Sequence, residues 1–127
     1  MTNDEIRSFI DNSIKENRVM LFMKGTPQQP ACGFSMRTSG ALNVLGVKYA
    51  ALDILPDPRI RQELSELSGW PTIPQLFVDG ELVGGCDIVT EMYESGELAQ
   101  VLGVEDTDAE VEAAPVQKGP IGLENNL

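Results

Sequence analysis

The stretch Cys32-Gly33-Phe34-Ser35 decides how the chain is read. It follows an apolar run, Val19–Met23, and a loop over residues 25–30 that is rich in glycine and proline. The run predicts a strand buried on both faces, as in a parallel sheet, and the loop ends that strand. A helix is then expected from Cys32 or Gly33 to Leu45, with Gly46 as its stop.

Helical periodicity predicts four further helices. Residues 4–16 begin after Asn3, an expected N-cap, and carry an apolar stripe. A second segment, residues 56–67, has Asp57 as a cap and Pro58 in its first turn. The last two helices are expected over residues 87–94 and 97–102. The apolar stripes are formed by Ile6, Phe9, Ile10 and Ile14 in the first helix, by Phe34, Ala41, Leu42 and Leu45 in the Cys32 helix, and by Ile60, Leu64 and Leu67 in the 56–67 helix.

Three more strands complete the pattern, over residues 47–53, 75–78 and 81–84. Asp79-Gly80 separates the last two and is typical of a type I′ hairpin. Strands that alternate with helices and end in a hairpin predict an α/β fold. The expected architecture is a four-stranded mixed sheet flanked by helices on both faces.

Composition narrows the function. The 127 residues suit one domain, and the net charge of −11 argues against nucleic acid and anionic membrane surfaces as partners. No apolar run approaches the roughly 20 residues of a membrane-spanning helix, and the acidic N-terminus does not resemble a signal or transit peptide. A cytoplasmic location is therefore expected.

The chain has two cysteines and no histidine, which excludes the usual histidine-dependent catalytic sites and a structural zinc site within one chain. The usual Ser-His and Cys-His catalytic pairs need a histidine. A structural zinc site needs about four ligands, usually Cys and His. In a reducing cytosol, Cys32 and Cys86 are expected to be free thiols.

The composition changes at Val104. Residues 104–127 contain six Asp or Glu residues and one Lys, a net charge of −5, with several prolines and glycines. This composition predicts an acidic, disordered tail after a folded domain over residues 1–103.

Cys32 is the expected centre of the chemistry. A thiol at a helix start faces unpaired backbone N–H groups and the positive end of the helix dipole, which favour the thiolate. Lys24, directly after the strand, can add positive charge. The alternative, that Cys32 is a small buried hydrophobic residue, fits poorly with Pro30, Gly33 and Ser35 around it. Ser35 stands where a second thiol would be needed to resolve a mixed disulfide, so release must come from outside.

Three other features are weaker taken singly. Thr72-Ile73-Pro74 precedes a strand, and a cis Ile73–Pro74 bond would offer the Ile73 backbone to an extended peptide. From this tripeptide alone, an ordinary loop proline is the favoured interpretation. Gly84-Gly85-Cys86-Asp87 opens a helix whose N–H groups suit a carboxylate, while Asp87 suits an ammonium group. An ordinary helix cap explains that segment equally well. Arg61, and Arg59 beside it, could reach a ligand carboxylate or face solvent.

These segments, in this order, resemble the monothiol glutaredoxin family over residues 3–103. The matching segments are Lys24-Gly25-Thr26-Pro27, Pro30, Cys32-Gly33-Phe34-Ser35, Arg61, Trp70-Pro71-Thr72-Ile73-Pro74-Gln75 and Gly84-Gly85-Cys86-Asp87. The resemblance implies a thioredoxin fold with a glutathione site. In that site Lys24 and Arg61 hold the glycyl carboxylate, the Ile73 backbone pairs with the cysteinyl part, and Cys86 and Asp87 receive the γ-glutamyl end, with Trp70 shaping the groove.

The resemblance also implies a [2Fe–2S] cluster between two subunits, with one Cys32 and one glutathione thiol from each. Such a cluster needs four thiolates, and one chain offers one well-placed thiol. The expected function is storage, transfer and assembly of iron–sulfur clusters as a homodimer, with apo iron–sulfur proteins as recipients and at most weak oxidoreductase activity.

Other functions remain open on the sequence. Cys32 and the same groove would also serve a glutathione-dependent oxidoreductase that acts on protein thiols. Family resemblance alone suggests a BolA-like partner that shares the cluster. A Cys32–Cys86 disulfide switch would need Cα atoms within about 7 Å of each other, a distance that the sequence does not give.

Overall fold

Strands and helices alternate along residues 1–104, the part of the chain that the computed structural model describes. Their order is α1 (Asn3–Glu16), β1 (Val19–Met23), α2 (Gly33–Leu45), β2 (Ala50–Asp53), α3 (Pro58–Ser68), β3 (Gln75–Val78), β4 (Glu81–Gly84), α4 (Cys86–Ser95) and α5 (Glu97–Leu102). Among these residues no helix has the length and apolar character needed to cross a membrane. The predicted disordered tail lies, after Val104, outside the described residues.

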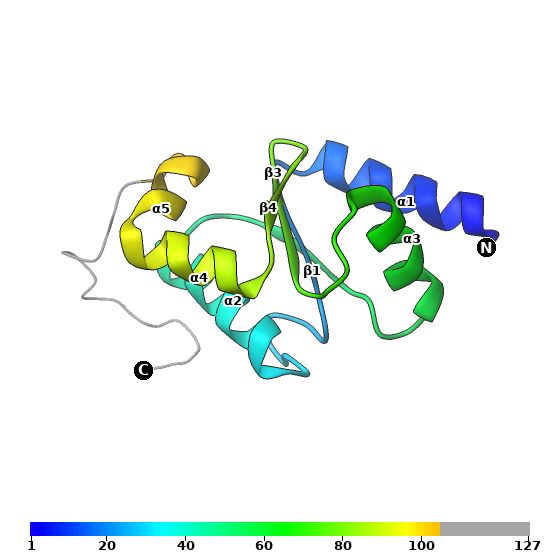
Figure 1. Cartoon of the computed structure of the whole chain (residues 1–127), viewed down its shortest axis with the longest axis horizontal. Helices are drawn as coiled ribbons and strands as arrows, with labels where there is room; N and C mark the ends of the chain where they lie inside the picture. Colours follow the sequence, from blue (N-terminus) through cyan, green and yellow to red (C-terminus); the bar gives the residue numbers. More distant parts are fainter. Residues whose placement is uncertain (105–127) are drawn as a thin grey trace.

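The four strands form one mixed sheet in the order β2-β1-β3-β4. β1 runs parallel to β2, with Met23 beside Asp53, and antiparallel to β3, with Phe22 beside Gln75. In Figure 1 the sheet stands between α1 and α3 on one side and α2, α4 and α5 on the other. The predicted α/β class and the four-stranded mixed sheet between two layers of helices are confirmed.

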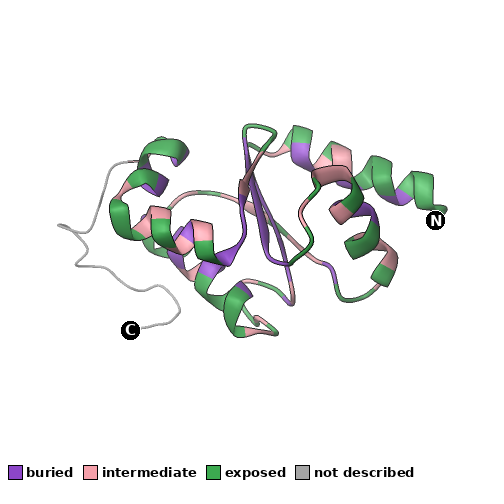
Figure 2. Cartoon of the chain, viewed as in Figure 1, coloured by how far each residue is buried: buried purple, intermediate pink, exposed green. Residues whose placement is uncertain are grey.

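β1 is buried along its whole length (Figure 2), as its apolar run predicts. Its side chains contribute to two separate cores. Successive side chains of a strand point to opposite faces, so Leu21 and Met23 pack on one side and Met20 and Phe22 on the other. The first core joins β1 and β3 to α2, α4 and α5, and comprises Val19, Leu21, Met23, Ala41, Leu42, Leu45, Leu76, Val78, Val89, Leu98, Ala99 and Leu102.

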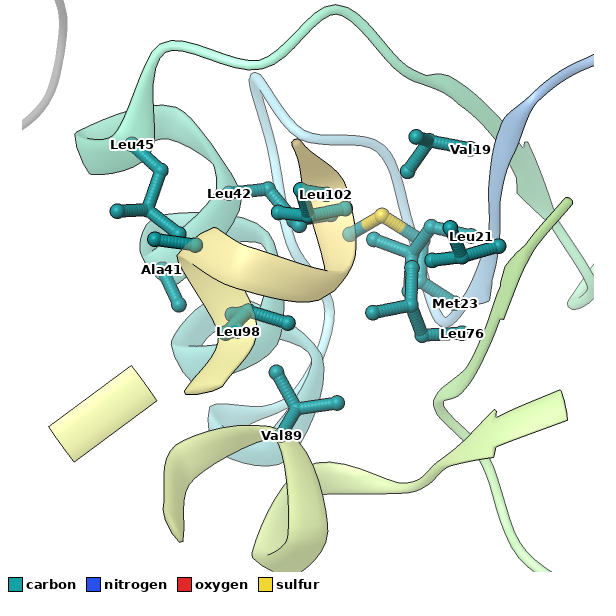
Figure 3. Packing of buried hydrophobic residues seen from close by; sticks show 12 residues of the cluster. Val19, Leu21, Met23, Ala41, Leu42, Leu45, Leu76, Val89, Leu98 and Leu102 are labelled. Atoms are coloured by element: carbon teal, nitrogen blue, oxygen red, sulfur yellow. The ribbon is translucent and has the colours of Figure 1, made fainter. Parts of the chain in front are cut away.

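The second core joins the sheet to α1 and α3, and comprises Ile6, Ile10, Ile14, Met20, Phe22, Ile54, Leu64, Ile73 and Phe77. In it the rings of Phe22 and Phe77 meet edge to face at 5.7 Å between centroids, a favoured aromatic geometry. Figure 3 shows the first core, where leucines of α2 and α5 face Leu21, Met23 and Leu76 of the sheet. Each helical layer is therefore held to the sheet by its own apolar cluster.

The predicted helix and turn signals are mostly confirmed. Asp57 caps α3 through its side chain, which accepts from the Arg59 N–H, and Pro58 is the first residue of the helix. α2 ends at Gly46, as expected. Asp79 and Gly80 have φ values of 53° and 83°, the pair of positive angles that a type I′ turn requires. The hairpin between β3 and β4 is therefore built as the sequence predicts.

Two expectations about α1 are wrong. The N-cap is Thr2 and not Asn3: the Thr2 side chain accepts from the Glu5 N–H, and Glu5 accepts from the Thr2 N–H, which completes a capping box. Asn3 is already helical. Phe9 is 45% exposed and lies outside the buried stripe, because Ile6, Ile10 and Ile14 alone fill the contact with the sheet and α3.

The predicted inner face of α2 is wrong at Phe34, which is 54% exposed. The turn of α2 nearest the thiol buries three small polar side chains in its place, Ser35, Thr38 and Ser39. Thr38 and Ser39 satisfy their hydroxyls on backbone carbonyls of the preceding turn. β2 is also shorter than predicted and starts at Ala50, since residues 47–49 lie beyond the end of its pairing with β1.

Candidate functional site

The loop between β1 and α2 is folded back on itself. Ala31 donates its N–H to the Lys24 carbonyl at 2.9 Å, and Gly25 and Pro30 form an isolated antiparallel bridge. Within the loop, Thr26 and Gln29 bond to each other through their backbones. The loop therefore leaves β1 and returns to the same place, which puts Cys32 close to the end of the strand.

Cys32 is the N-cap of α2, with extended backbone angles and a side chain turned toward the first helical turn. Its Sγ accepts from the Ser35 N–H at 3.4 Å and lies 3.4 Å from Ser35 Oγ. These are the contacts that a capping side chain makes with the unpaired N–H groups of a helix start. The predicted placement of the thiol at the positive end of α2 is confirmed.

Ser35 does more than replace a second thiol. It is fully buried, and its Oγ accepts the Lys24 N–H at 3.0 Å. Because this bond occupies a lone pair of the hydroxyl, the hydroxyl proton is free to point at the neighbouring Cys32 sulfur. In the thiol form Cys32 donates to Ser35 Oγ, and in the thiolate form the Ser35 hydroxyl donates to the sulfur.

The pKa of the Cys32 thiol lies below its ordinary value. Burial acts to raise this pKa, but the hydrogen bonds from the Ser35 hydroxyl, the Ser35 N–H and the Phe34 N–H, together with the charge of Lys24, outweigh it. Donors that favour the charged form lower a thiol pKa in this way. The site therefore holds a larger thiolate fraction at neutral pH than a free cysteine.

A second part of the site precedes β3. The Ile73–Pro74 bond is cis, and Ile73 is buried at the edge of the second core. The chain ahead of it is held by two side chains: Gln75 Nε2 donates to the Trp70 and Thr72 carbonyls at 3.0 and 3.2 Å, and Arg61 Nη2 donates to the Pro71 carbonyl at 3.2 Å. Arg61 is thus anchored beside this turn while its side chain stays exposed.

A third part is the start of α4. Cys86 is buried, and Asp87 next to it is exposed. Trp70 packs against Gly85, where a Cβ would lie 3.0 Å from Trp70 Nε1 and 3.2 Å from the Pro74 carbonyl oxygen. This close approach joins the turn before β3 to the start of α4.

The three parts meet at one end of the sheet. β1 and β3 pair with Phe22 beside Gln75, so Lys24 follows β1 at the same end of the sheet where Ile73 precedes β3. Across from them, Arg37 of α2 lines an open groove with Cys86 and Asp87 of α4; its other walls are Thr90, Glu91 and Glu94. Lys24 and Cys32 are joined through Ser35 at this end of the sheet, and Cys86 and Asp87 share the groove with Arg37. Arg61 is bonded to Pro71, two residues before Ile73.

Among residues 1–104, the positively charged side chains near the site form no salt bridges with acidic residues. Within residues 1–104, Arg7, Lys15, Arg18 and Arg59 form salt bridges, whereas Lys24, Arg37, Lys48 and Arg61 form none. Three of these four unpaired cations border the site. Arg59, the weaker alternative to Arg61, is occupied by Asp57 and by the Met1 carbonyl.

Sequence reasoning missed three residues here. Arg37, which stacks over Phe34 at 5.3 Å from the ring centroid, follows Cys32 by little more than one helical turn, and that spacing could have revealed it. Gln75 and Asp53 bond to neighbouring loops, and only the register of the sheet shows which atoms they reach.

Of the two thiols, only Cys32 is partly exposed, so each chain can supply one thiolate ligand to a metal. Both cysteines are free, and Cys86 is buried. Residues 1–104 hold no group of three or more His, Cys, Asp or Glu side chains that could bind a metal ion. A metal centre at Cys32 would therefore draw its remaining ligands from other molecules.

Comparison with known proteins identifies the family. A family model described as Glutaredoxin matches residues 19–83. A probable monothiol glutaredoxin 2 of Rickettsia typhi is 52% identical over 102 residues, covering 80% of this chain and 91% of the relative. Glutaredoxin 4 of Escherichia coli is 55% identical over 93 residues, covering 73% and 81%.

A solved structure agrees as well. A monomeric truncated mutant of Trypanosoma brucei 1-C-Grx1 is 45% identical, with a TM-score of 0.71, and the match covers 80% of this chain and 96% of that one. The fold is thus the thioredoxin fold of the glutaredoxins. The chain belongs to the glutaredoxin family, in its monothiol branch.

Proposed function

We propose that this protein binds glutathione and carries a [2Fe–2S] cluster between two subunits, and that it stores clusters and passes them to apo iron–sulfur proteins. In this proposal Cys32 is the cluster ligand of each subunit. Glutathione lies along Lys24, Arg61, Ile73, Cys86 and Asp87. Cluster transfer is the main activity, and any oxidoreductase activity is weak.

The observation that carries the proposal is the surroundings of Cys32. Its sulfur sits at the start of α2, bonded to both donors of Ser35, and its pKa is lowered. Thiolates are the ligands of iron–sulfur clusters. With serine at position 35, the helix that carries Cys32 offers no second thiol to resolve a mixed disulfide.

The charges around the thiol fit glutathione, which has two carboxylates and one ammonium group. Among residues 1–104, Lys24 and Arg61 form no salt bridge, and they suit the glycyl carboxylate. At the other end, the N–H groups at the start of α4 suit the γ-glutamyl carboxylate, and Asp87 suits its ammonium group. The Ile73 backbone between them suits the cysteinyl part.

The ligand count supports two subunits. A [2Fe–2S] cluster takes four thiolates, and one Cys32 from each of two chains with one glutathione thiol from each supplies four. The bound cluster supplies the iron and sulfide that a recipient needs. The residues of the chain hold the glutathiones, keep Cys32 as a thiolate, and offset negative charge through Lys24 and the N–H groups of α2.

The proposal is tested on full-length protein purified anaerobically with glutathione. Visible absorption with iron and sulfide analysis should give about one [2Fe–2S] cluster per two chains, lost when glutathione is removed or when Cys32 is replaced by Ser. A colourless protein that resists reconstitution, or a Cys32→Ser variant that keeps a full cluster, contradicts the proposal.

A second function, reduction of glutathione–protein disulfides, is favoured by the lowered pKa of Cys32, because a thiolate is also a nucleophile. Release of the mixed disulfide would then come from a second glutathione. A deglutathionylation assay separates the two functions. Turnover equal to that of a dithiol glutaredoxin would favour the oxidoreductase, and a Ser35→Cys variant provides the dithiol reference in the same fold.

The setting of the protein forms part of the same proposal. In this proposal residues 1–103 are the glutaredoxin domain. A free Cys32 thiol needs a reducing compartment, which supports the cytoplasm as location. The homodimer forms with the cluster, and a BolA-like protein is a candidate alternative partner, supported by family resemblance. A pull-down with glutathione and iron that recovers no such protein would count against that partner.

A further inference from the structure

Asp53 lies at the point where two loops leave the sheet. It is the last residue of β2 and pairs with Met23, the last residue of β1, in the parallel register. One carboxylate oxygen, Oδ1, accepts from the Gly25 N–H at 2.9 Å and from the Leu55 N–H at 3.0 Å. A single atom therefore joins the loop that carries Cys32 to the connection that leads into α3.

The Gly25 end of this link is a rigid part of the chain. Gly25 is buried with φ of 86°, and a Cβ there would lie 2.5 Å from the Gln29 carbonyl oxygen and 2.6 Å from the Ala31 nitrogen. Only glycine fits such a close approach at this angle. The loop is therefore closed at Gly25, and whatever holds the Gly25 amide holds the base of the loop.

Two consecutive amides are fixed from opposite directions. The Lys24 N–H bonds to Ser35 Oγ, next to the Cys32 sulfur, and the Gly25 N–H bonds to Asp53. Peptide planes have little freedom besides φ and ψ, so these two bonds fix the backbone that carries Lys24. The charge of Lys24 in turn acts on the Cys32 thiol.

The Leu55 end of the link leads to Arg61. Leu55 lies two residues ahead of Asp57, the N-cap of α3, and Arg61 is in the second turn of that helix. Holding the Leu55 amide and the Gly25 amide on one oxygen fixes the start of α3 relative to the loop. Lys24 and Arg61 are the two cations that lie on either side of this link.

We propose that Asp53 is a positioning residue that sets the separation of Lys24 and Arg61, and with it the affinity for the glycyl carboxylate of glutathione. The inference rests on the proposed function, because it takes glutathione as the ligand. It assigns to Asp53 no contact with glutathione itself.

A purely local role for Asp53 would look different. Aspartate often accepts the N–H two residues ahead of it in an Asx turn, and the Leu55 bond alone would meet that description. The Gly25 bond reaches another loop, 28 positions away in sequence. A turn residue would stabilise the fold without changing the binding of a ligand by a distant lysine.

The test compares three Asp53 variants in the full-length apo protein. Glutathione binding is measured by calorimetric or NMR titration, and the exchange of the Gly25 and Leu55 amides is followed by NMR. Asp53→Ala should weaken glutathione binding about tenfold, as loss of an outer supporting residue often does, and speed the exchange of both amides. Asp53→Asn keeps an oxygen in place without the charge and should bind within about twofold of the wild type.

Asp53→Glu gives the complementary variant, since it keeps the charge but moves the oxygens by one methylene. It should bind more weakly than Asp53→Asn, and this order decides the matter even if Asp53→Ala does not fold. Thr2→Ala is the stability control: it removes the capping box of α1, should lower the melting temperature, and should leave glutathione affinity unchanged.

The failures can be told apart. A wild-type chain that binds no glutathione refutes the proposed function. A wild-type chain that binds it, with Asp53→Ala equal in affinity or with Asp53→Glu equal to wild type and Asp53→Asn weak, overturns the positioning role of Asp53.

Discussion

A cysteine stands at the start of two helices of this protein, and the two thiols differ in helix position, burial and contacts. Cys32 is the N-cap of α2, and its sulfur accepts from the Ser35 N–H. Cys86 is the first residue of α4, one position further along, and its sulfur is buried against the Thr90 hydroxyl at 3.9 Å. Both thiols lie at the positive end of a helix dipole.

The difference shows that a place at a helix start does not by itself bring a cysteine sulfur to the helix N–H groups. The side chain of an N-cap residue turns toward the unpaired N–H groups, whereas a residue inside the helix points away from them. Both sulfurs have a hydroxyl nearby, Ser35 for Cys32 and Thr90 for Cys86, but only the Cys32 sulfur accepts a backbone N–H of its helix start. One position along the chain therefore separates a half-buried capping thiol from a buried one.

Replacing each cysteine in turn by serine is expected to give the largest difference between the two positions. Cys32→Ser should abolish cluster binding, because it removes the one thiolate that each chain supplies. Cys86→Ser should keep the cluster and weaken glutathione binding by no more than about threefold, since the site uses the start of α4 chiefly through its backbone. Iron and sulfide analysis of both variants checks this, and loss of the cluster in both would remove the contrast.

Removal of the hydroxyl beside each thiol is expected to have the next largest effect. Ser35→Ala takes a donor from the Cys32 thiolate and should slow its alkylation at pH 7 by roughly threefold to tenfold. Thr90→Ala, the matched change at Cys86, should leave Cys32 alkylation as it is. The measurement is the rate of reaction with iodoacetamide across a pH series.

The pH series also has an expected direction. The folded pKa of Cys32 lies below that of the unfolded chain, so the thiolate contributes stability that is fully present above the unfolded pKa and is lost as pH falls through the folded pKa. Because Ser35→Ala removes a donor that lowers the Cys32 pKa, the pH profile of Cys32 alkylation should shift to higher pH in this variant. A profile that coincides with that of the wild type would show that the Ser35 hydroxyl does not stabilise the thiolate.

A smaller effect is expected from the glycines beside the two cysteines. At Gly85 a Cβ would press on Trp70 Nε1 and on the Pro74 carbonyl, a backbone atom that cannot turn away. Gly85→Ala should cost about 1 kcal/mol of unfolding free energy by overpacking. A Cβ at Gly33 meets nothing within 4 Å, so Gly33→Ala should be neutral or slightly stabilising. Chemical denaturation of both variants tests the contrast.

The smallest expected effect concerns the charge near Cys32. Lys24 is the weakest of the factors that lower the Cys32 pKa. Lys24→Gln should slow alkylation only about twofold at low salt, and less at high salt, because exposed charges are screened. Lys48→Gln, an unpaired lysine outside the site, is the control and should change nothing. Equal effects from both would point to net charge alone.

Much of the fold was predictable because several signals agreed. The apolar run of β1, the Asp79-Gly80 turn and the Asp57-Pro58 start of α3 each have a local physical cause, and each is confirmed. The Thr2 cap was also readable, since Glu5 follows it at capping-box spacing. Asn3 has N-cap chemistry of its own, so only the pairing of Thr2 with Glu5 distinguishes the two positions.

The errors and omissions come from packing. Phe34 is apolar, yet the first turns of α2 bury the smaller side chains of Ser35, Thr38 and Ser39 instead. A hydrophobicity pattern does not show how large a side chain a position can hold. Asp53 gave no signal, because its partner Gly25 becomes a neighbour only through the β1–β2 register. The position of Cys32 at a helix start was predictable, but the two bonds from Ser35 were not.

The sheet separates two cores that share no side chains, and the site takes Cys32 and Asp87 from one helical layer and Arg61 from the other. A glutathione molecule that contacts both helical layers would link them, so that neither layer could separate from the sheet without releasing the glutathione. A ligand that binds only the native state raises its stability by about 2.7 kcal/mol at a hundred times the dissociation constant. The melting temperature of this protein would then rise and fall with the glutathione content of its surroundings.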